Sequence, residues 1–246
     1  MSISQEVTHA MILAAGRGTR MLHLTEDLPK PMIPVRGRPI LETIIRGLQE
    51  NGVRRVLVVV GYRKEVIMDH FGDGQNFGLE IDYVVQEVQN GTGKVVELGR
   101  SFTGAQPFVL AYGDILVPAS SYAPLVRLDG DDARIAVRVN EDVSKGGAVF
   151  INEEGLMTDL IEKGGPGQPT SPYYNAGIYT FSPVIHDYVS RLRLSPRGEY
   201  ELTDAIREMA YDGLAVRAVE LQGEWADVRD PGVVQDLNQT QTQTTA

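Results

Sequence analysis

The chain has 246 residues, no cysteine, and 33 acidic against 23 basic side chains, which gives a formal net charge of −10. A chain of this length can bury a sizeable core. The lack of cysteine excludes disulfides, thiolate zinc sites and cysteine nucleophiles, and it suits a reducing cytoplasm. The acidic balance argues against a nucleic-acid-coating surface. No apolar run approaches the roughly 18–20 residues of a membrane span, and the first ten residues lack the pattern of a signal peptide. We therefore expect a cytoplasmic protein without a nucleic-acid or membrane partner.

The first half of the chain alternates apolar, β-branched runs with amphipathic segments. The expected strands are 8–14, 55–61, 79–85 and 107–111, and the expected helices are 39–50, 64–71 and 92–101. Such alternation predicts an α/β fold with a mainly parallel sheet that helices cover on both faces. Ligands of such sheets bind at the carboxyl ends of the strands, here the loops at 15–30, 61–63, 86–93 and 112–118.

The pattern changes after about residue 130, where turn-rich segments separate short strands. We expect strands at 133–140, 147–152, 158–162, 173–181 and 214–221, and helices at 183–191 and 200–212. The second half therefore adds antiparallel strands to the sheet. No break in composition marks an independent domain, so we expect one domain over 1–237, with halves at about 8–130 and 131–237. The polar segment 238–246 (NQTQTQTTA) predicts a disordered tail.

A glycine loop follows the first strand, with the sequence Leu13-Ala-Ala-Gly-Arg-Gly-Thr-Arg-Met21. Glycine allows a ligand to approach the backbone closely, and exposed N–H groups can cradle a phosphate. The loop has neither the third glycine of the dinucleotide fingerprint nor the Gly-Lys-Ser/Thr of a Walker A loop. From spacing alone, a phosphate loop and an ordinary turn with solvated arginines stand on equal terms.

Lys30 lies between two prolines, Pro29 and Pro31, which restrict the backbone around it. The prolines would hold the ammonium group in place for an anion at a low cost in entropy. Taken alone, the same residues describe a rigid surface loop with a solvated lysine.

Seven motifs in order resemble the sugar-1-phosphate nucleotidyltransferases, the uridylyl-, thymidylyl- and guanylyltransferases that make nucleotide sugars. They are the opening LAAGRGTRM with LPKPMIPVRGRPILE, then YVVQEVQNGTG (83–93), YGDI (112–115), IEKG (161–164), YNAGIY (174–179), GEYELTDAI (198–206) and WADV (225–228). The resemblance runs from about residue 10 to 237. It implies a Rossmann-like domain with a nucleotide-binding half followed by a sugar-binding half.

The resemblance also assigns roles to single residues. Asp114 and Asp227 match the metal ligands, which implies Mg²⁺ as the cofactor; two carboxylates suit an ion that keeps waters and takes phosphate oxygens. The catalytic cations are Arg20 at the leaving phosphates, Lys30 at the α-phosphate and Lys163 at the sugar phosphate. The nucleotide-binding positions are Leu13, Ala14, Ala15, Gly16, Gly18, Thr19, Gln86, Gly91 and Thr92, with Gln86 reading a pyrimidine. The sugar-binding positions are Gly147, Glu162, Asn175 and Gly177.

The implied reaction joins an NTP and a sugar 1-phosphate to give an NDP-sugar and pyrophosphate. Gln86 favours UTP or dTTP, whereas the segment GYRKEVIMDHFGDGQNFGLEIDY also resembles mannose- and heptose-1-phosphate guanylyltransferases. A different class of function remains an alternative, because relatives of this fold serve as non-catalytic sugar-nucleotide-binding regulatory subunits. The resemblance further admits a homo-oligomer. No hexapeptide repeat occurs in these 246 residues, so we expect no acyltransferase of the β-helix kind within them.

Overall fold

A single nine-stranded sheet organises the protein, for which the computed structural model describes residues 6–139, 141–143, 146–162 and 169–244. The strands of this sheet are β1 (His9–Leu13), β4 (Arg55–Val60), β5 (Glu80–Val85), β6 (Phe108–Tyr112), β8 (Ala133–Val139), β9 (Gly147–Ile151), β10 (Met157–Glu162), β11 (Tyr173–Phe181) and β12 (Val216–Glu220). Their main order is β10-β9-β11-β6-β1-β4-β5, and β8 pairs with both β11 and β12. The expected strands are all present, with bounds that differ by one or two residues.

The sheet is parallel in its first half and largely antiparallel in its second. Strand β1 runs parallel to both β4 and β6, and β4 runs parallel to β5. Strand β11 runs antiparallel to β6, β8 and β9, so it joins the two halves without a break in the sheet. The sheet is therefore mixed and mainly parallel around β1, as the sequence predicts.

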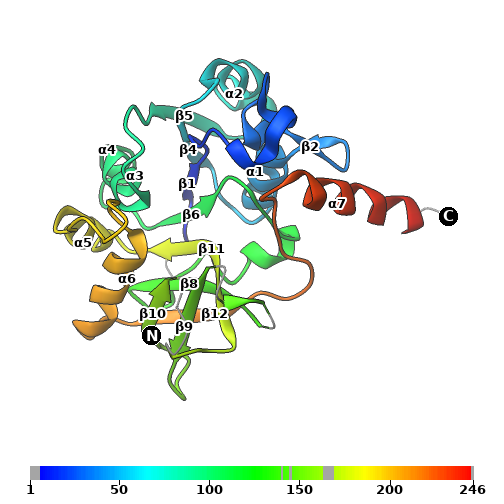
Figure 1. Ribbon diagram of the computed structural model, residues 1–246. Helices are drawn as coiled ribbons and strands as arrows, with labels where there is room; N and C mark the ends of the chain where they lie inside the picture. The colour runs from blue at the N-terminus through cyan, green and yellow to red at the C-terminus, as the bar shows by residue number, and fades with distance from the viewer. Residues whose placement is uncertain (1–5, 140, 144–145, 163–168, 245–246) are drawn as a thin grey trace.

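Helices cover both faces of the sheet (Figure 1). They are α1 (Ile40–Glu50), α2 (Lys64–Phe71), α3 (Thr92–Leu98), α4 (Arg100–Thr103), α5 (Ile185–Ser190), α6 (Leu202–Tyr211) and α7 (Pro231–Thr244). One core lies under α1 and α2 and contains Ile12 and Val58, while the other lies under α3, α5 and α6 and contains Met11 and Leu57. The side chains of successive residues in each parallel strand thus point alternately into the two cores, which explains why these strands are continuously apolar.

Helix α1 shows how the pattern produces the packing. Its apolar positions Ile40, Leu41, Ile44, Ile45 and Leu48 are all buried, as their helical spacing predicts. Burial of each such side chain contributes about 1.5–3 kcal/mol before conformational entropy is counted. The helix ends at Glu50, just before Gly52, which adopts a positive φ.

The expected helix over 92–101 is broken in the structure into α3 and α4. Gly99 ends the first and precedes the second, and an added Cβ there would collide with the side chain of Met11. Glycine at the point where the helix breaks therefore leaves room for the end of the Met11 side chain.

The segment 238–246, for which the sequence predicts a disordered tail, begins within α7, which extends to Thr244. The helix buries Val234 and Leu237 against the first core, and the side chain of Arg36 binds the carbonyl oxygen of Leu237. These tertiary contacts hold a segment whose polar composition predicts no order. Residues 245 and 246 lie outside the described part of the chain.

Two short strand pairs lie outside the main sheet and bring distant segments together. Strand β2 (Pro34–Val35) pairs with β3 (Arg38–Pro39), and β7 (Ile115–Leu116) pairs with β13 (Ala226–Asp227). Short 3-10 helices occur at Thr19–Thr25, Lys30–Met32, Gln75–Phe77 and Ala119–Tyr122. Among the described residues, no helix combines the length and apolarity needed to cross a bilayer.

Candidate active site

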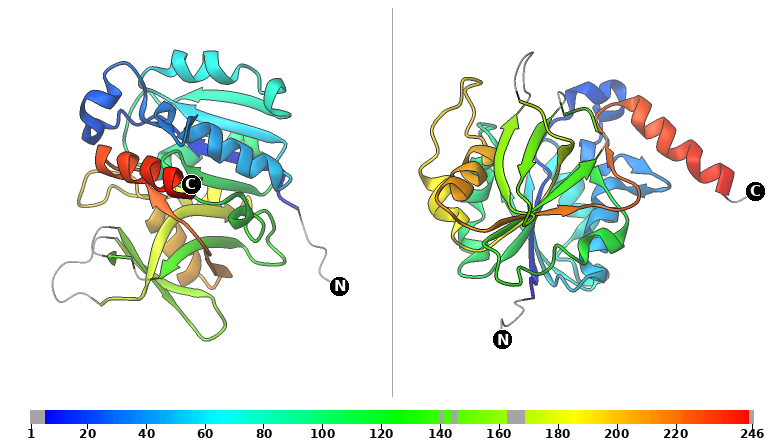
Figure 2. Two further views of the ribbon diagram at one scale, coloured as in Figure 1. Left: turned by 90° about the vertical axis from the view of Figure 1, so that its right-hand side faces the viewer. Right: turned by 90° about the horizontal axis from the view of Figure 1, so that it is seen from below.

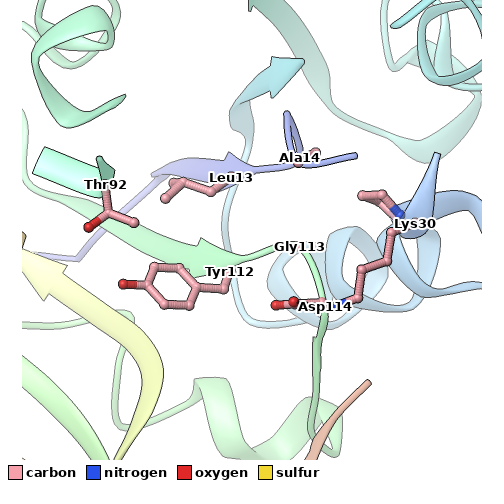
Figure 3. A pocket seen from close by; sticks show the side chains of 9 residues that line it. Leu13, Ala14, Lys30, Thr92, Tyr112, Gly113 and Asp114 are labelled. Carbon is pink, nitrogen blue, oxygen red and sulfur yellow. Dashed lines mark hydrogen bonds and ion pairs between the residues drawn. The ribbon is translucent and has the colours of Figure 1, made fainter. Parts of the chain in front are cut away.

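A cleft of about 460 Å³ opens at the carboxyl end of the parallel strands. Strand register explains its position, because Leu13 of β1 lies level with Val59 of β4 and Tyr112 of β6. Three strands therefore end together, and the loops that follow them form the walls. The lining residues are Leu13, Ala14, Gly16, Lys30, Pro31, Thr92, Tyr112, Gly113 and Asp114 (Figure 3).

The backbone around the cleft is packed too closely for side chains at two glycines. An added Cβ at Gly113 would lie 2.7 Å from the carbonyl oxygen of Leu13, to which the Gly113 N–H already donates at 3.0 Å. Gly18 has a φ of 68°, and its Cβ would lie 2.7 Å from Cβ of Lys30. The glycine loop therefore packs directly on the stem of Lys30, which explains the glycine at this position of the motif.

Lys30 and Asp114 form an ion pair across the cleft. Their Nζ and Oδ2 atoms are 2.5 Å apart, and the side chains are 13% and 31% exposed. The two residues come from different loops, after β1 and after β6, and Figure 3 shows both side chains pointing toward each other. An anion and a cation that enter this cleft together would each find one member of the pair with the opposite charge.

Asp227 is brought beside Asp114 by the pairing of β13 with β7. In this register Asp227 lies opposite Ile115, and the N–H of Val228 donates to the carbonyl oxygen of Asp114 at 2.9 Å. Burial and the charge of Asp114 raise the pKa of Asp227, while the nearby Lys30 opposes the shift. Two carboxylates that repel each other in a partly buried position form a suitable donor set for a divalent cation.

The two carboxylates do not form a complete metal cage. Within the described ranges, no group of three or more His, Cys, Asp or Glu side chains is arranged to hold a metal. A magnesium ion at Asp114 and Asp227 would therefore need water or phosphate oxygens to complete its shell, as Mg²⁺ usually does. The residues present fit such an ion when a phosphate substrate accompanies it.

Two further arginines contribute positive charge near Asp227. Arg20 is an exposed residue of the glycine loop, and like Arg229 it opposes the rise in the pKa of Asp227. The Nε atom of Arg229 lies 3.6 Å from Oδ2 of Asp227. Sequence reasoning missed Arg229, which lies just after β13, where its N–H donates to the carbonyl oxygen of Asp227 at 2.8 Å and the chain turns.

The other expected nucleotide residues are divided between two hollows. Gly16 and Thr19 are exposed on the loop, while Gln86 lines an adjoining pocket of about 640 Å³ between the end of β5 and α3. The structure therefore does not bring Gln86 into the same cleft as Lys30. Gln89, which the sequence did not single out, donates through its amide to the carbonyl oxygen of Ala15 at 3.1 Å.

Gly91 and Thr92 lie at the start of α3, between the two hollows. Thr92 lines the cleft, and its hydroxyl accepts a hydrogen bond from the N–H of Leu202 at 3.1 Å. Gly93 donates to the carbonyl oxygen of Tyr200 at 2.8 Å. The nucleotide loop is thus tied to the start of α6, which explains the structural part of the GEYELTDAI motif.

All four expected sugar-binding residues lie on the neighbouring strands β9, β10 and β11. Gly147 pairs with Glu162 across β9 and β10, and Gly177 lies at the irregular turn of the β11 register, next to β8. The side chain of Asn175 is engaged locally: its amide donates to the Tyr179 hydroxyl at 2.8 Å and its oxygen accepts from the Gly177 N–H at 3.2 Å. Lys163 lies outside the described residues, so the structure does not place it.

Glu162 opens onto a further pocket, of about 940 Å³, that reaches the loop before α6. Arg197 lines the same pocket, with its Nη2 atom 3.5 Å from Oε2 of Glu162 and 2.9 Å from Oε1 of Glu201. Sequence reasoning missed Arg197, because a lone arginine before the GEYELTDAI motif resembles a solvated loop residue. Its pairing with the expected sugar-binding glutamate makes it a candidate for the same site.

A pair of tyrosines links the cleft with strand β11. Tyr112 lines the cleft, and its ring centroid lies 5.9 Å from that of Tyr179 in an edge-to-face arrangement. Burial raises the pKa of Tyr112 to about 12, so its hydroxyl stays protonated at neutral pH and can donate a hydrogen bond. Since Asn175 donates to Tyr179, the pair connects the floor of the cleft with the sugar-side bulge.

The expected resemblance is confirmed by comparison with known proteins. The profile of the nucleotidyl transferase family matches residues 9–246. The chain is 36% identical over 231 residues to the bifunctional protein GlmU of Methanococcus aeolicus, covering 93% of this chain but 53% of that protein. It therefore spans about half the length of that relative. It is also 35% identical to the UTP–glucose-1-phosphate uridylyltransferase AglF of Haloferax volcanii, covering 90% of this chain and 91% of AglF.

The fold agrees with that of a solved relative. The structure of a UDP-glucose pyrophosphorylase complexed with UDP-glucose superimposes with a TM-score of 0.82 over 97% of this chain and 99% of the other, at 22% sequence identity. This likeness confirms the expected Rossmann-like fold class. With the family profile spanning nearly every residue and the fold in agreement, the chain belongs to the nucleotidyl transferase family.

Proposed function

We propose that the protein transfers a nucleotidyl group from an NTP to a sugar 1-phosphate and releases pyrophosphate. The observation that carries the proposal is the cleft at the strand ends, where Lys30 and Asp114 pair at 2.5 Å and Asp227 lies beside them. Both substrates are polyanions, so their mutual repulsion is the main obstacle to reaction. The fixed ammonium group of a lysine, and a cation bound by two carboxylates, would reduce this repulsion between the substrates and hold them in place.

The residues of the cleft act by binding and orientation. Lys30 exchanges Asp114 for the α-phosphate of the nucleotide, and the exposed Arg20 holds the β- and γ-phosphates that leave. The glycine loop, from Leu13 to Thr19, lies along the triphosphate. The N–H of Ala14 donates to the carbonyl oxygen of Val59, so the N–H groups that follow it contact the phosphates. A phosphate oxygen of the sugar phosphate then attacks the α-phosphorus in line with the leaving pyrophosphate.

The carboxylates Asp114 and Asp227 would hold Mg²⁺, which supplies charge neutralisation at the α-phosphate and the sugar phosphate when it is bound. On the sugar side, Glu162 accepts hydrogen bonds from sugar hydroxyls, with Gly147, Asn175 and Gly177 around the ring. Lys163 is the proposed partner of the sugar phosphate. Arg197, which pairs with both Glu162 and Glu201, orients the Glu162 carboxylate toward the sugar.

The proposed nucleotide is UTP, with dTTP as the nearest alternative. Support comes from the AglF relative, which is named a UTP–glucose-1-phosphate uridylyltransferase, and from the position of Gln86 and Gly91 beside the pocket next to α3. Guanylyl transfer to mannose or heptose 1-phosphate is the alternative for the base and sugar. Both substrates are cytoplasmic metabolites, so the cytoplasm is the expected place of action.

A non-catalytic sugar-nucleotide-binding subunit is the second class of function. Such a protein needs the binding loops but not the metal carboxylates and the phosphate cations. Arg20, Lys30, Asp114 and Asp227 are all present, which favours catalysis.

The test is a pyrophosphate-release assay over a panel of NTPs and sugar 1-phosphates. We expect release with one preferred pair and a loss of orders of magnitude in turnover for Lys30→Ala and for Asp114→Ala, both folded. Lys64→Ala, a lysine at the start of α2 and outside the cleft, is the matched control and should retain turnover. No release with any pair would favour the binding subunit, and near-normal turnover of either variant would refute the role of that residue.

A further inference from the structure

Arg36 occupies an unfavourable backbone position. It is the first residue of the two-residue turn between β2 and β3, where Arg36 and Gly37 have φ values of 55° and 77°. Tight turns of this hand favour asparagine, aspartate or glycine, because other side chains crowd the backbone in the left-handed region. A strained arginine in such a turn calls for a reason in the contacts of its side chain.

The side chain and backbone of Arg36 hold one distant segment at three points. We call this segment, residues 221–238, the C-terminal strap; it runs from the end of β12 into α7. The guanidinium donates to both carboxylate oxygens of Glu224 at 2.6 Å, and its Nε donates to the carbonyl oxygen of Leu237 at 3.2 Å. The Arg36 N–H donates to the side-chain oxygen of Asn238 at 2.6 Å. Arg36 therefore binds the C-terminal strap near both of its ends, at Glu224 and at Leu237 and Asn238.

The middle of the strap carries Asp227. Figure 2 shows this orange segment leaving the lower half of the molecule and crossing to α7 in the upper half. Along the crossing, β13 contributes only two residues to its pairing with β7, and Trp225 donates through Nε1 to the carbonyl oxygen of Ala176 at 3.1 Å. Asp227 is thus held beside a carboxylate of like charge by a short strand pair, and it depends on the fixed ends of the strap.

Arg36 also belongs to the segment that carries Lys30. Only the 3-10 turn of Lys30–Met32 and the short strand β2 separate the two, and the N–H of Ile40 closes the hairpin on the carbonyl oxygen of Ile33 at 3.1 Å. The hairpin therefore connects the C-terminal strap, which carries Asp227, with the loop that carries Lys30, the partner of Asp114. Motion of the strap relative to this loop would change the separation of Asp227 from Lys30 and Asp114 together.

We infer that Arg36 is a positioning residue, whose fork to Glu224 and hold on α7 keep Asp227 in register with Asp114 for binding a divalent cation. The inference rests on the proposed function, since it concerns the same pair of carboxylates. Arg36 itself touches no reacting group, so it acts through the strap alone. A surface ion pair that only anchors α7 is the contrasting role.

The experiment measures Mn²⁺ binding to the full chain by electron paramagnetic resonance, alongside hydrogen exchange of the amides at 224–228. We expect Arg36→Ala to weaken Mn²⁺ binding about 10- to 100-fold, as the loss of groups that orient metal ligands does, and to speed exchange at Asp227 and Val228. Arg38→Ala is the matched control: Arg38 lies on the same hairpin but pairs with Glu42 at 3.5 Å, and its variant should bind Mn²⁺ as the wild type does.

Two more variants keep the test decisive if Arg36→Ala folds poorly. Arg36→Lys keeps the charge but cannot form the bidentate fork, so it should fold and show an intermediate loss of affinity. Glu224→Gln leaves the hold on α7 intact and should also weaken Mn²⁺ binding.

The outcomes separate this inference from the proposed function. Equal Mn²⁺ affinity in the wild type, Arg36→Lys and Glu224→Gln would overturn the positioning role, even if exchange in α7 increased. Wild-type protein that binds no Mn²⁺ would overturn the metal site and this inference with it. Wild-type protein whose Mn²⁺ binding depends on Arg36 but which releases no pyrophosphate would refute the proposed function and leave the positioning role supported.

Discussion

Replacing Gly113 with alanine tests whether the strand ends at the cleft are packed as tightly as the structure indicates. The new Cβ would lie 2.7 Å from the carbonyl oxygen of Leu13, 3.3 Å from its carbonyl carbon and 3.4 Å from Cα of Ala14. All three are backbone atoms of the strand end, so no flexible side chain can move aside. Relief requires β1 and β6 to separate where Gly113 now donates to Leu13 at 3.0 Å.

The expected cost is that of overpacking a well-packed interior, about 1–3 kcal/mol. For a domain of this size each kcal/mol lowers the Tm by roughly 2–4 °C. Urea unfolding followed by circular dichroism gives the free energy, and a thermal melt gives the Tm. Turnover should fall as well, because Asp114 follows directly in the chain.

Gly16→Ala is the control for this prediction. A Cβ at Gly16 would meet no atom within 4 Å, so its free energy of unfolding should stay within about 0.5 kcal/mol of the wild type. Its turnover should nevertheless fall, since the glycine loop is the proposed phosphate contact. If Gly113→Ala also unfolds within about 0.5 kcal/mol of the wild type, the reasoning from backbone packing is refuted.

Three other predictions concern buried polar groups. Tyr122→Phe should leave stability unchanged or raise it by about 1 kcal/mol in urea unfolding, because the buried hydroxyl has no hydrogen-bond partner among the residues that the structure describes; a clear loss would contradict this. Burial lowers the pKa of His186, whose ring lies 2.7 Å from the Thr103 hydroxyl. Below about pH 6.5 the unfolded chain therefore binds a proton at His186 that the folded chain does not bind. The free energy of unfolding then falls by up to about 1.4 kcal/mol for each unit that the pH is lowered. The slope between pH 6.5 and 5 should be smaller in His186→Phe, and an identical slope would exclude this linkage. Trp225→Phe should lose about 1 kcal/mol, because it removes the hydrogen bond to the Ala176 carbonyl; unchanged unfolding would show that water replaces the indole.

The helices and strands were predictable because the spacing of their apolar residues indicates which element forms and which of its faces is buried. The buried face of α1 follows directly from Ile40, Leu41, Ile44, Ile45 and Leu48, and the continuously apolar strands β1 and β4 indicate a sheet covered on both faces. Such local patterns depend on neighbours within one element. They therefore predict which elements form, and strand register then determines where the elements end together.

Long-range polar pairs were not predictable in the same way. Lys30 and Asp114 are 84 residues apart in the sequence. From the sequence, only the motifs of a known family indicate that the two residues belong to one site. Gln89, Arg197 and Arg36 lie in loops, where a polar side chain is ordinarily solvated, and nothing in their local sequence indicates a partner. The contact of α7 with Arg36 was not predictable for the same reason, since the polar composition of the segment does not reveal it.

Gln86 lies apart from the ion pair of Lys30 and Asp114. The residue lines the pocket between the end of β5 and α3, while the ion pair lies in the cleft lined by Thr92 and Tyr112. The base and the triphosphate would then occupy neighbouring hollows, with Gly91 and Thr92 between them. Exchange of Gln86 should accordingly change the choice of nucleotide more than the rate with the preferred one.

The most direct test of nucleotidyl transfer at this cleft follows the phosphorus atoms of the substrate. Wild-type protein, UTP, glucose 1-phosphate and Mg²⁺ are incubated and monitored by ³¹P NMR, with Lys30→Ala and Lys64→Ala in parallel. We expect equal amounts of UDP-sugar and pyrophosphate from the wild type and Lys64→Ala, and almost none from Lys30→Ala. Product from Lys30→Ala at the wild-type rate, or no pyrophosphate from the wild type with any NTP and sugar 1-phosphate, would contradict this expectation.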